Sequence, residues 1–166
     1  MSEKPLTIMV DTNVWLDIFI PNRPSKEGSL SFFEAARDNN VELVYTLEIA
    51  RAVFRIVSLE AKGWVRKGKG MLPDEYARAI ASHAWDFIES MQELGTPVGS
   101  STADLWLASK LRDEHADLED NLIVAACMRL EVDYLVTSDA KLIRHAPVAT
   151  ATPSMMTKLL NMGTGR

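Results

Sequence analysis

The stretch that decides the fold is residues 6–10, LTIMV, which runs directly into Asp11, Thr12 and Asn13. A short apolar run that ends at turn-forming residues is typical of a strand buried on both faces of a sheet. Four further stretches are predicted as strands: residues 41–45, 96–99, 133–137 and 147–150.

Helical patterns separate these strands. The predicted helices cover residues 13–20, 25–39, 47–61, 73–95, 101–113, 117–131 and 153–160. Residues 62–70, KGWVRKGKG, contain three glycines and four basic residues and are predicted to form a loop. The alternation of strands and helices predicts an α/β fold, in which a mostly parallel sheet of four or five strands lies between two layers of helices.

Length and composition indicate one globular domain. The chain has 166 residues, of which 47% are hydrophobic and 25% charged, as in ordinary folded proteins. We expect the domain to cover residues 1–161 and a flexible tail to cover residues 162–166. The longest apolar runs are too short to span a bilayer and no signal peptide is evident, so a cytoplasmic protein with no membrane association is expected. The net charge, 18 − 23 = −5, argues against nucleic-acid binding by bulk charge alone.

Four acidic residues fall at one predicted edge of the sheet. Asp11 follows the first strand, and Glu48 opens the helix after the second. Asp139 follows the strand at 133–137, and Asp120 lies in the first turn of the helix that leads into that strand. Because ligands of open α/β sheets bind beyond the carboxyl ends of the strands, the four acids are predicted to share a site.

Asp120 gives the strongest single indication of function. Ile123, Val124 and Cys127 follow it at helical spacing, which places Asp120 on or beside the face that packs on the sheet. Carboxylates crowded against a core raise one another's pKa, and a divalent cation would remove that cost. Mg²⁺ prefers oxygen ligands and keeps several waters, an arrangement that suits attack on a phosphodiester.

Each acid also has a purely structural explanation. Asp11 could cap the helix that follows it, and Asp120 could favour a helix N-terminus. Asp139 could stabilise a turn, and Glu48 could be a solvated surface acid. Each explanation is at least as good as a functional one when its residue is taken singly, but the recurrence at one edge favours a site.

The other chemistry-bearing residues are predicted to be structural. None of the three histidines has a histidine partner at helical spacing or a neighbouring cysteine, so a zinc site is not expected. Cys127, Trp85 and Trp106 fall in helical patterns and are predicted to lie in the core.

Together these segments resemble the PIN domain, a metal-dependent nuclease fold. The resemblance rests on IMVDTNVWLD at residues 8–17, DLEDNLIVAA at 117–126 and DYLVTSD at 133–139, which occur in the family's order. It implies a parallel sheet in strand order 3-2-1-4-5 and a set of acids that hold Mg²⁺ or Mn²⁺. Many bacterial relatives, the VapC-like proteins, are the toxin ribonucleases of toxin–antitoxin pairs.

The resemblance assigns roles to individual acids. Asp11, Asp120 and Asp139 match the family's first, third and fourth acids, and Glu48 matches the second in position. These four are implied to be catalytic. Asp11, Asp120 and Asp139 are implied to hold the metal ion, and Asp117, one turn before Asp120, could supply an additional carboxylate.

The resemblance also implies residues that bind the substrate. Asn13 and Ser138 resemble positions that hydrogen-bond the acids or the substrate. Small PIN toxins often carry a two-helix clip where this chain has residues 62–95. We expect basic residues of the loop in this segment to contact RNA phosphates, the alternative being a solvated loop. The basic residues are Arg66, Lys67 and Lys69, and Trp64 beside them is expected to stack on a base.

Three functions follow from these features. The leading one is an endoribonuclease that acts as a toxin, with an RNA substrate, an antitoxin that would cover the acids, and a homodimer as in many relatives. The second is a PIN-like scaffold that binds RNA or a protein partner without cutting. The third is a phosphohydrolase with an aspartyl nucleophile. Such enzymes usually carry Asp-x-Asp after the first strand, whereas here Asn13 stands two residues after Asp11, which argues against this function.

Overall fold

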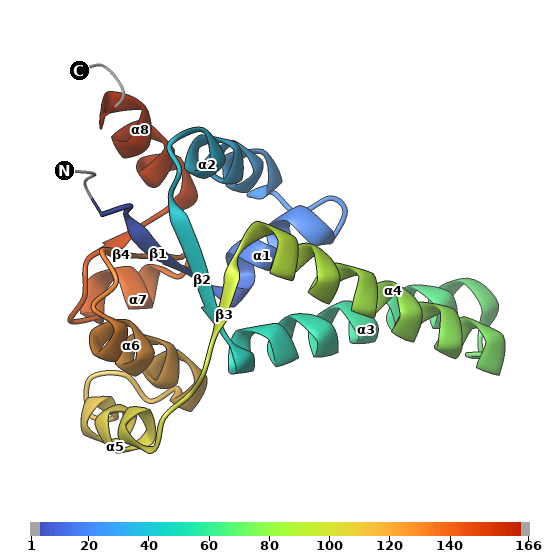
Figure 1. The fold of residues 1–166 in the computed structure, drawn as a ribbon. Helices are drawn as coiled ribbons and strands as arrows, with labels where there is room; N and C mark the ends of the chain where they lie inside the picture. Colours follow the sequence, from blue (N-terminus) through green and yellow to red (C-terminus); the bar gives the residue numbers. More distant parts are fainter. Residues whose placement is uncertain (1–3, 164–166) are drawn as a thin grey trace.

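A five-stranded parallel sheet forms the centre of the molecule (Figure 1). The structure is a computed structural model, and it describes residues 4–163. The strands are β1 (Thr7–Val10), β2 (Glu42–Thr46), β3 (Thr96–Val98), β4 (Tyr134–Val136) and β5 (Thr150–Ala151). Their order across the sheet is β3-β2-β1-β4-β5, which confirms the predicted α/β class and strand order. β1 is central, and its Ile8 pairs with Leu43 on one side and Tyr134 on the other.

Helices cover both faces of the sheet. They are α1 (Thr12–Phe19), α2 (Lys26–Asp38), α3 (Leu47–Lys69), α4 (Asp74–Leu94), α5 (Thr102–Leu111), α6 (Leu118–Leu130), α7 (Ala140–His145) and α8 (Pro153–Gly163). Packing contacts join α8, α2, α1, α3 and α4 into one group, and α5 packs on α6 in another. The arrangement has the three layers that the sequence predicted (Figure 1). Within the described residues, none of the helices has the length and apolar character that crossing a membrane would require.

Trp15 fixes helix α1 to the sheet. Its ring is fully buried and lies 4.8 Å from the ring of Phe33 and 5.5 Å from that of Tyr45, measured between centroids. Its indole Nε1 donates a hydrogen bond to the backbone oxygen of Val10 at 3.2 Å. Buried aromatic rings contribute strongly to a core, so this cluster holds the turn between β1 and α1 in place, with Asp11 at its centre.

The prediction of a loop at residues 62–70 is wrong. Helix α3 continues through this segment to Lys69 and ends at Gly70, which adopts a left-handed conformation with φ 73°. A glycine inside a helix costs only about 1 kcal/mol relative to alanine, and packing against α4 offsets that cost. Phe54 and Trp85 meet across the two helices at 5.2 Å between centroids, and Lys69 Nζ lies over the Tyr76 ring at 4.8 Å.

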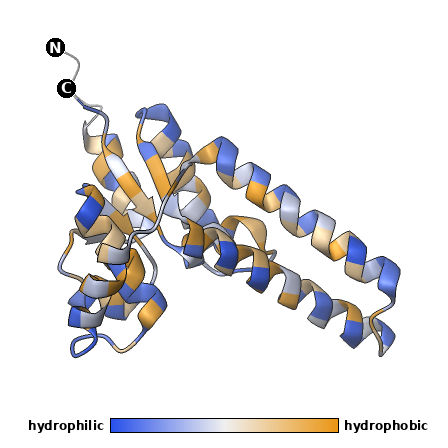
Figure 2. Ribbon diagram, turned by 60° about the horizontal axis from the view of Figure 1, so that its bottom comes forward, coloured by the Kyte–Doolittle hydropathy of each residue, from blue (hydrophilic) through white to orange (hydrophobic). Residues whose placement is uncertain are grey.

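The α3–α4 hairpin extends well beyond the sheet. Figure 2 shows hydrophilic and hydrophobic residues mixed along both of its helices. The predicted clip at residues 62–95 is thus a longer helical hairpin that begins directly after β2.

Three smaller differences concern the ends of the chain and the core. Helix α7 was not predicted, and α8 continues to Gly163, so the helix includes the first two residues of the predicted tail. Residues 164–166 lie outside the described residues. Trp85 and Trp106 are exposed rather than buried, by 58% and 65%, whereas Cys127 is buried as predicted.

Candidate acidic site at the carboxyl edge of the sheet

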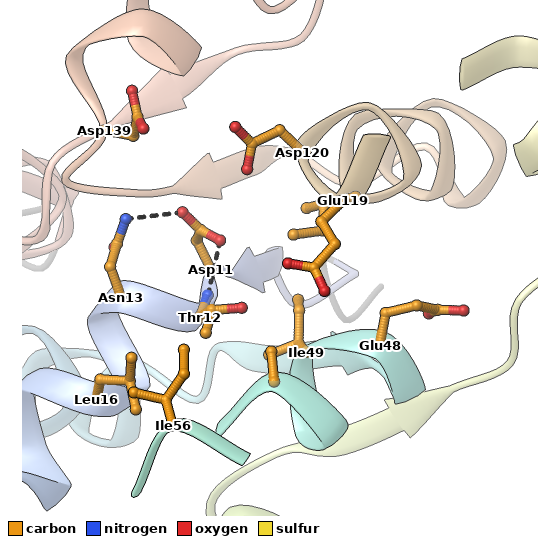
Figure 3. A pocket seen from close by; sticks show the side chains of 12 residues that line it. Asp11, Thr12, Asn13, Leu16, Glu48, Ile49, Ile56, Glu119, Asp120 and Asp139 are labelled. Atoms are coloured by element: carbon orange, nitrogen blue, oxygen red, sulfur yellow. Dashed lines mark hydrogen bonds between the residues drawn. The ribbon is translucent and has the colours of Figure 1, made fainter. Parts of the chain in front are cut away.

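Asp11 lies at the centre of the candidate site. Its Oδ1 accepts the backbone N–H of Thr12 at 2.7 Å, which caps α1, and its Oδ2 accepts a hydrogen bond from Asn13 Nδ2 at 2.9 Å (Figure 3). Oδ2 also accepts a hydrogen bond from Thr137 Oγ1 at 2.6 Å. Burial raises the pKa of Asp11, and the negative charge of Asp139 raises it further. The hydrogen bonds to Asp11 act in the opposite direction and lower its pKa. The residue is only 4% exposed. Capping therefore accounts for one of its oxygens, while the other is held by Thr137 and Asn13.

Asp139 is joined to Asp11 through a hydroxyl that the sequence analysis did not single out. Thr137 Oγ1, which donates to Asp11, also accepts the backbone N–H of Asp139 at 3.0 Å. The Oδ1 atom of Asp139 accepts the backbone N–H groups of Lys141 at 2.6 Å and Leu142 at 3.2 Å, and so caps α7. The position of Thr137 at the end of β4, two residues before an acid, was the available signal.

Asn13 and Ser138 complete this network. Asn13 Nδ2 donates to Asp11, and Asn13 Oδ1 accepts the backbone N–H of Ser138 at 3.2 Å. Asn13 thus hydrogen-bonds Asp11, and its contact with the substrate stays a prediction. The contribution of Ser138 is made by its backbone.

Asp120 reaches the site from α6. Its side chain is 24% exposed, and Figure 3 shows its carboxylate on the same side of the pocket as Asp11 and Asp139. Burial raises the pKa of Asp120 to about 7, and the negative charges of Asp11, Asp117 and Asp139 contribute. Near neutral pH this carboxyl group is therefore poised between its two protonation states unless a cation stabilises the charged form.

His115, for which the sequence analysis found no signal, lies beside Asp120. Its Nε2 is 3.1 Å from Oδ2 of Asp120, but the contact lacks hydrogen-bond geometry, and this buried nitrogen has no hydrogen-bond partner among the described residues. The Nδ1 atom accepts the backbone N–H of Asp117 at 3.1 Å, and the His115 backbone oxygen accepts from Asn121 Nδ2 at 2.7 Å. These bonds hold the segment before α6 against the helix.

A cavity of about 190 Å³ lies among these side chains. Its lining combines carboxylates with apolar side chains. None of the described residues that line it is basic. The acids of the cavity are Asp11, Glu48, Glu119, Asp120 and Asp139, and its apolar side chains are those of Leu16, Ile49, Ala52, Ile56 and Ile123.

Glu48 lies at the rim of the cavity rather than at its centre. In Figure 3 its carboxylate points away from Asp11, and its Oε1 accepts a hydrogen bond from Ser100 Oγ at 2.5 Å. Burial tends to raise the pKa of Glu48, but this hydrogen bond and others outweigh burial, and the pKa is lowered. Glu119, a fifth acid that the sequence analysis did not select, extends into the space between Asp120 and Glu48 (Figure 3).

Asp117 belongs to the edge of the site. Its Oδ1 accepts the backbone N–H of Asp120 at 3.2 Å, so it is the N-cap of α6. It lines a second, more open hollow of about 640 Å³, which shares Asp120 and Asp139 with the first cavity. We call this second space the α7 hollow.

The basic residues predicted to bind RNA are not brought to the acids. Arg66 lies 18 residues after Glu48 in the same helix, which corresponds to about 27 Å along the helix axis at 1.5 Å per residue. Arg66, Lys67 and Lys69 are exposed near the end of the α3–α4 hairpin. Their contact with RNA stays a prediction.

The chemistry of the donor set fits a hard divalent cation. Several carboxylates converge, no basic residue is among the described residues that line the cavity, and burial raises the pKa of Asp11 and Asp120. Across residues 4–163, no three His, Cys, Asp or Glu side chains are grouped so that they could hold a metal ion by themselves. An ion here would need water or substrate oxygens as well, as Mg²⁺ sites in proteins commonly do.

Comparison with known proteins agrees with this geometry. The fold is similar to that in the crystal structure of VapBC2 from Rickettsia felis bound to a DNA fragment from their promoter, with a TM-score of 0.56 and 15% sequence identity over 89% of this chain and 98% of that chain. A search of curated proteins found no significant match. A family model described as PIN domain matches residues 7–141, a span that contains Asp11, Glu48, Asp120 and Asp139. With most of its length matched, and with the sheet order and acidic edge described above, this chain belongs to the PIN domain family.

Proposed function

We propose that the protein is a metal-dependent endoribonuclease that acts as the toxin of a toxin–antitoxin pair. The observation that carries the proposal is the convergence of Asp120 with Asp11 and Asp139 on a cavity whose described lining contains no basic residue. Burial, together with the charges of these neighbours, raises the pKa of Asp120 to about 7. Membership of the PIN family supports the reaction class. The similarity to the VapBC2 structure, together with the resemblance of the sequence to VapC-like toxins, supports the biological role.

Asp11, Asp120 and Asp139 would hold Mg²⁺ or Mn²⁺, with Asp117 as an additional carboxylate at the edge. When bound, such an ion neutralises charge on a phosphodiester and lowers the pKa of water. The protein's own contribution is to keep the acids in place before the substrate arrives. Hydrogen bonds from Asn13 and Thr137 fix Asp11, and such support from neighbouring groups is what a catalytic constellation needs.

Glu48 has a separate role in the proposal. Its lowered pKa keeps it ionised at neutral pH, so at the rim of the cavity it would add negative charge that favours a cation and accept a hydrogen bond from water. Hydrolysis would leave a 5′-phosphate and a 3′-hydroxyl. The proposed partners are RNA, an antitoxin that covers the acidic cavity, and a second copy of the chain, in the cytoplasm.

The proposal is tested by cleavage of labelled single-stranded RNA with Mg²⁺ or Mn²⁺, with and without EDTA. We expect EDTA to stop cleavage and Asp11→Asn and Asp139→Asn to abolish it, while circular dichroism shows that both variants fold. The matched control is Asp113→Asn, which makes the same chemical change at a side chain that is 88% exposed.

Full activity of Asp11→Asn and Asp139→Asn would refute the assignment of the site. Binding of RNA without cleavage in either metal would instead support a scaffold that no longer cuts.

A further inference from the structure

Helix α7 places basic side chains beside the acids. The lining of the α7 hollow contains the acids Glu114, Asp117, Asp120 and Asp139, and with them the basic side chains of Lys141 and Arg144. We propose that Lys141 and Arg144 bind backbone phosphates of the RNA strand next to the phosphodiester held at the acids. This inference rests on the proposed function and identifies the path by which the substrate strand reaches the site.

A site acid, Asp139, fixes the N-terminus of α7. Asp139 caps the helix through the N–H groups of Lys141 and Leu142, and Leu142 is buried, with an exposed fraction of 1%. Residues three apart in a helix lie on one face, so Lys141 and Arg144 project together. Because the capping acid and the two cations belong to one short, anchored element, the distance between them is built into the fold.

Both cations are available for a ligand. Lys141 and Arg144 are exposed, and neither takes part in an ion pair formed by the described residues. The contrast is with Arg23 and Arg129, whose side chains are committed to Asp17 at 2.8 Å and Asp104 at 2.7 Å. An exposed lysine and arginine on one face are donors that suit phosphate oxygens.

Of the two spaces that share Asp120 and Asp139, the α7 hollow is the one whose described lining contains basic side chains. The protein has a net charge of −5, and the acidic cavity repels a polyanion. The α7 hollow contains Lys141 and Arg144 next to Asp120 and Asp139, whereas the first cavity has no basic residue in its described lining. The cationic end of α3 lies about 27 Å along the helix from Glu48. Phosphate contacts position a strand without reading its sequence, which is the role assigned here.

The test is binding of a fluorescent single-stranded RNA in EDTA, followed by anisotropy across a salt series. The variant is the double substitution Lys141→Ala with Arg144→Ala. Each phosphate contact to a single strand contributes about 0.7 to the slope of log K against log salt. We therefore expect the slope to decrease by about 1.4 and affinity to fall, while in the cleavage assay KM rises and kcat stays near the wild-type value.

The matched control removes two positive charges at a distance from the α7 hollow. Arg37→Ala with Lys158→Ala changes exposed residues on α2 and α8, and we expect RNA affinity and salt slope close to those of the wild type. A third variant, Lys141→Arg with Arg144→Lys, keeps both charges and should retain binding.

An unchanged slope and KM in the Lys141→Ala, Arg144→Ala variant would overturn the inference. So would an equal loss in the Arg37→Ala, Lys158→Ala control, since that would show a bulk charge effect. The same measurement on single-stranded DNA should show the same proportional loss, and a loss confined to RNA would refute recognition through phosphate. Because binding is measured without metal, this test does not depend on cleavage. Absence of RNA cleavage would refute the proposed function, and the binding experiment would still test the role of Lys141 and Arg144.

Discussion

Replacement of Asp120 by asparagine should stabilise the metal-free protein at alkaline pH while it destroys the proposed activity. Asp120 is held against the core near Asp11 and Asp139, and the three carboxylates repel one another when ionised. An asparagine side chain at this position would have nearly the same shape and no charge. The wild-type residue is therefore expected to cost folding free energy, as residues at functional sites often do.

The magnitude and sign follow from the pKa. The carboxyl group of Asp120 has a pKa of about 7 in the folded protein and 3.8 as its ordinary value, a difference that corresponds to at most about 4 kcal/mol. Since the side chain is 24% exposed, solvent screening reduces the expected cost to about 2 kcal/mol. Between the two pKa values the folded state binds more protons than the unfolded state, so the free energy of unfolding falls as pH rises through this window.

The assay is urea unfolding in EDTA from pH 4 to pH 8, followed by tryptophan fluorescence. We expect Asp120→Asn to match the wild type near pH 4 and to be about 2 kcal/mol more stable at pH 8. Asp113→Asn, at an 88% exposed side chain, should show no such pH-dependent gain. Added Mg²⁺ should stabilise the wild type by mass action and stabilise the variant less. A variant that is less stable at pH 8, or a difference independent of pH, would refute the reasoning.

Two further predictions concern residues around the site. Arg129→Ala should lower the free energy of unfolding by about 3 kcal/mol, because it leaves Asp104, 3% exposed, without the guanidinium that lies 2.7 Å away. Urea unfolding measures this loss, and the control Arg112→Ala, whose side chain is 77% exposed, should show little effect. Ser100→Ala should raise the pKa of Glu48, since the hydrogen bond from Ser100 lowers it. NMR titration of the Glu48 carboxyl carbon measures this pKa, and an unchanged value would show that the hydrogen bond is not formed in solution.

The acidic edge could be predicted because it depends on chain order. Asp11 and Asp139 follow strands directly, and parallel strands end at one edge whatever the details of packing. The helical spacing of Ile123 and Val124 after Asp120 likewise placed this acid near the core. The orientation of Glu48 could not be obtained this way, since it depends on Ser100, which lies 52 residues later in the chain.

The error at residues 62–70 has a different origin. Glycines and clustered charges favour a loop when only local preferences are considered. The segment is helical because α4 packs against α3, and such tertiary contacts outweigh a weak local preference. The consequence is functional as well as structural, since Arg66 and Lys67 lie far along the helix from the acids instead of on a loop that could fold toward them.

The sequence by itself determined the α/β class, the parallel sheet and the set of acids at its carboxyl edge, because these follow from the period of apolar residues and from chain order. Only the tertiary structure decided which groups act on those acids. His115 meets Asp120, Thr137 bridges Asp11 and Asp139, and α7 brings Lys141 beside them. The bridge from Thr137 to Asp11 joins residues 126 positions apart, and it exists only once the sheet has brought the strand ends together.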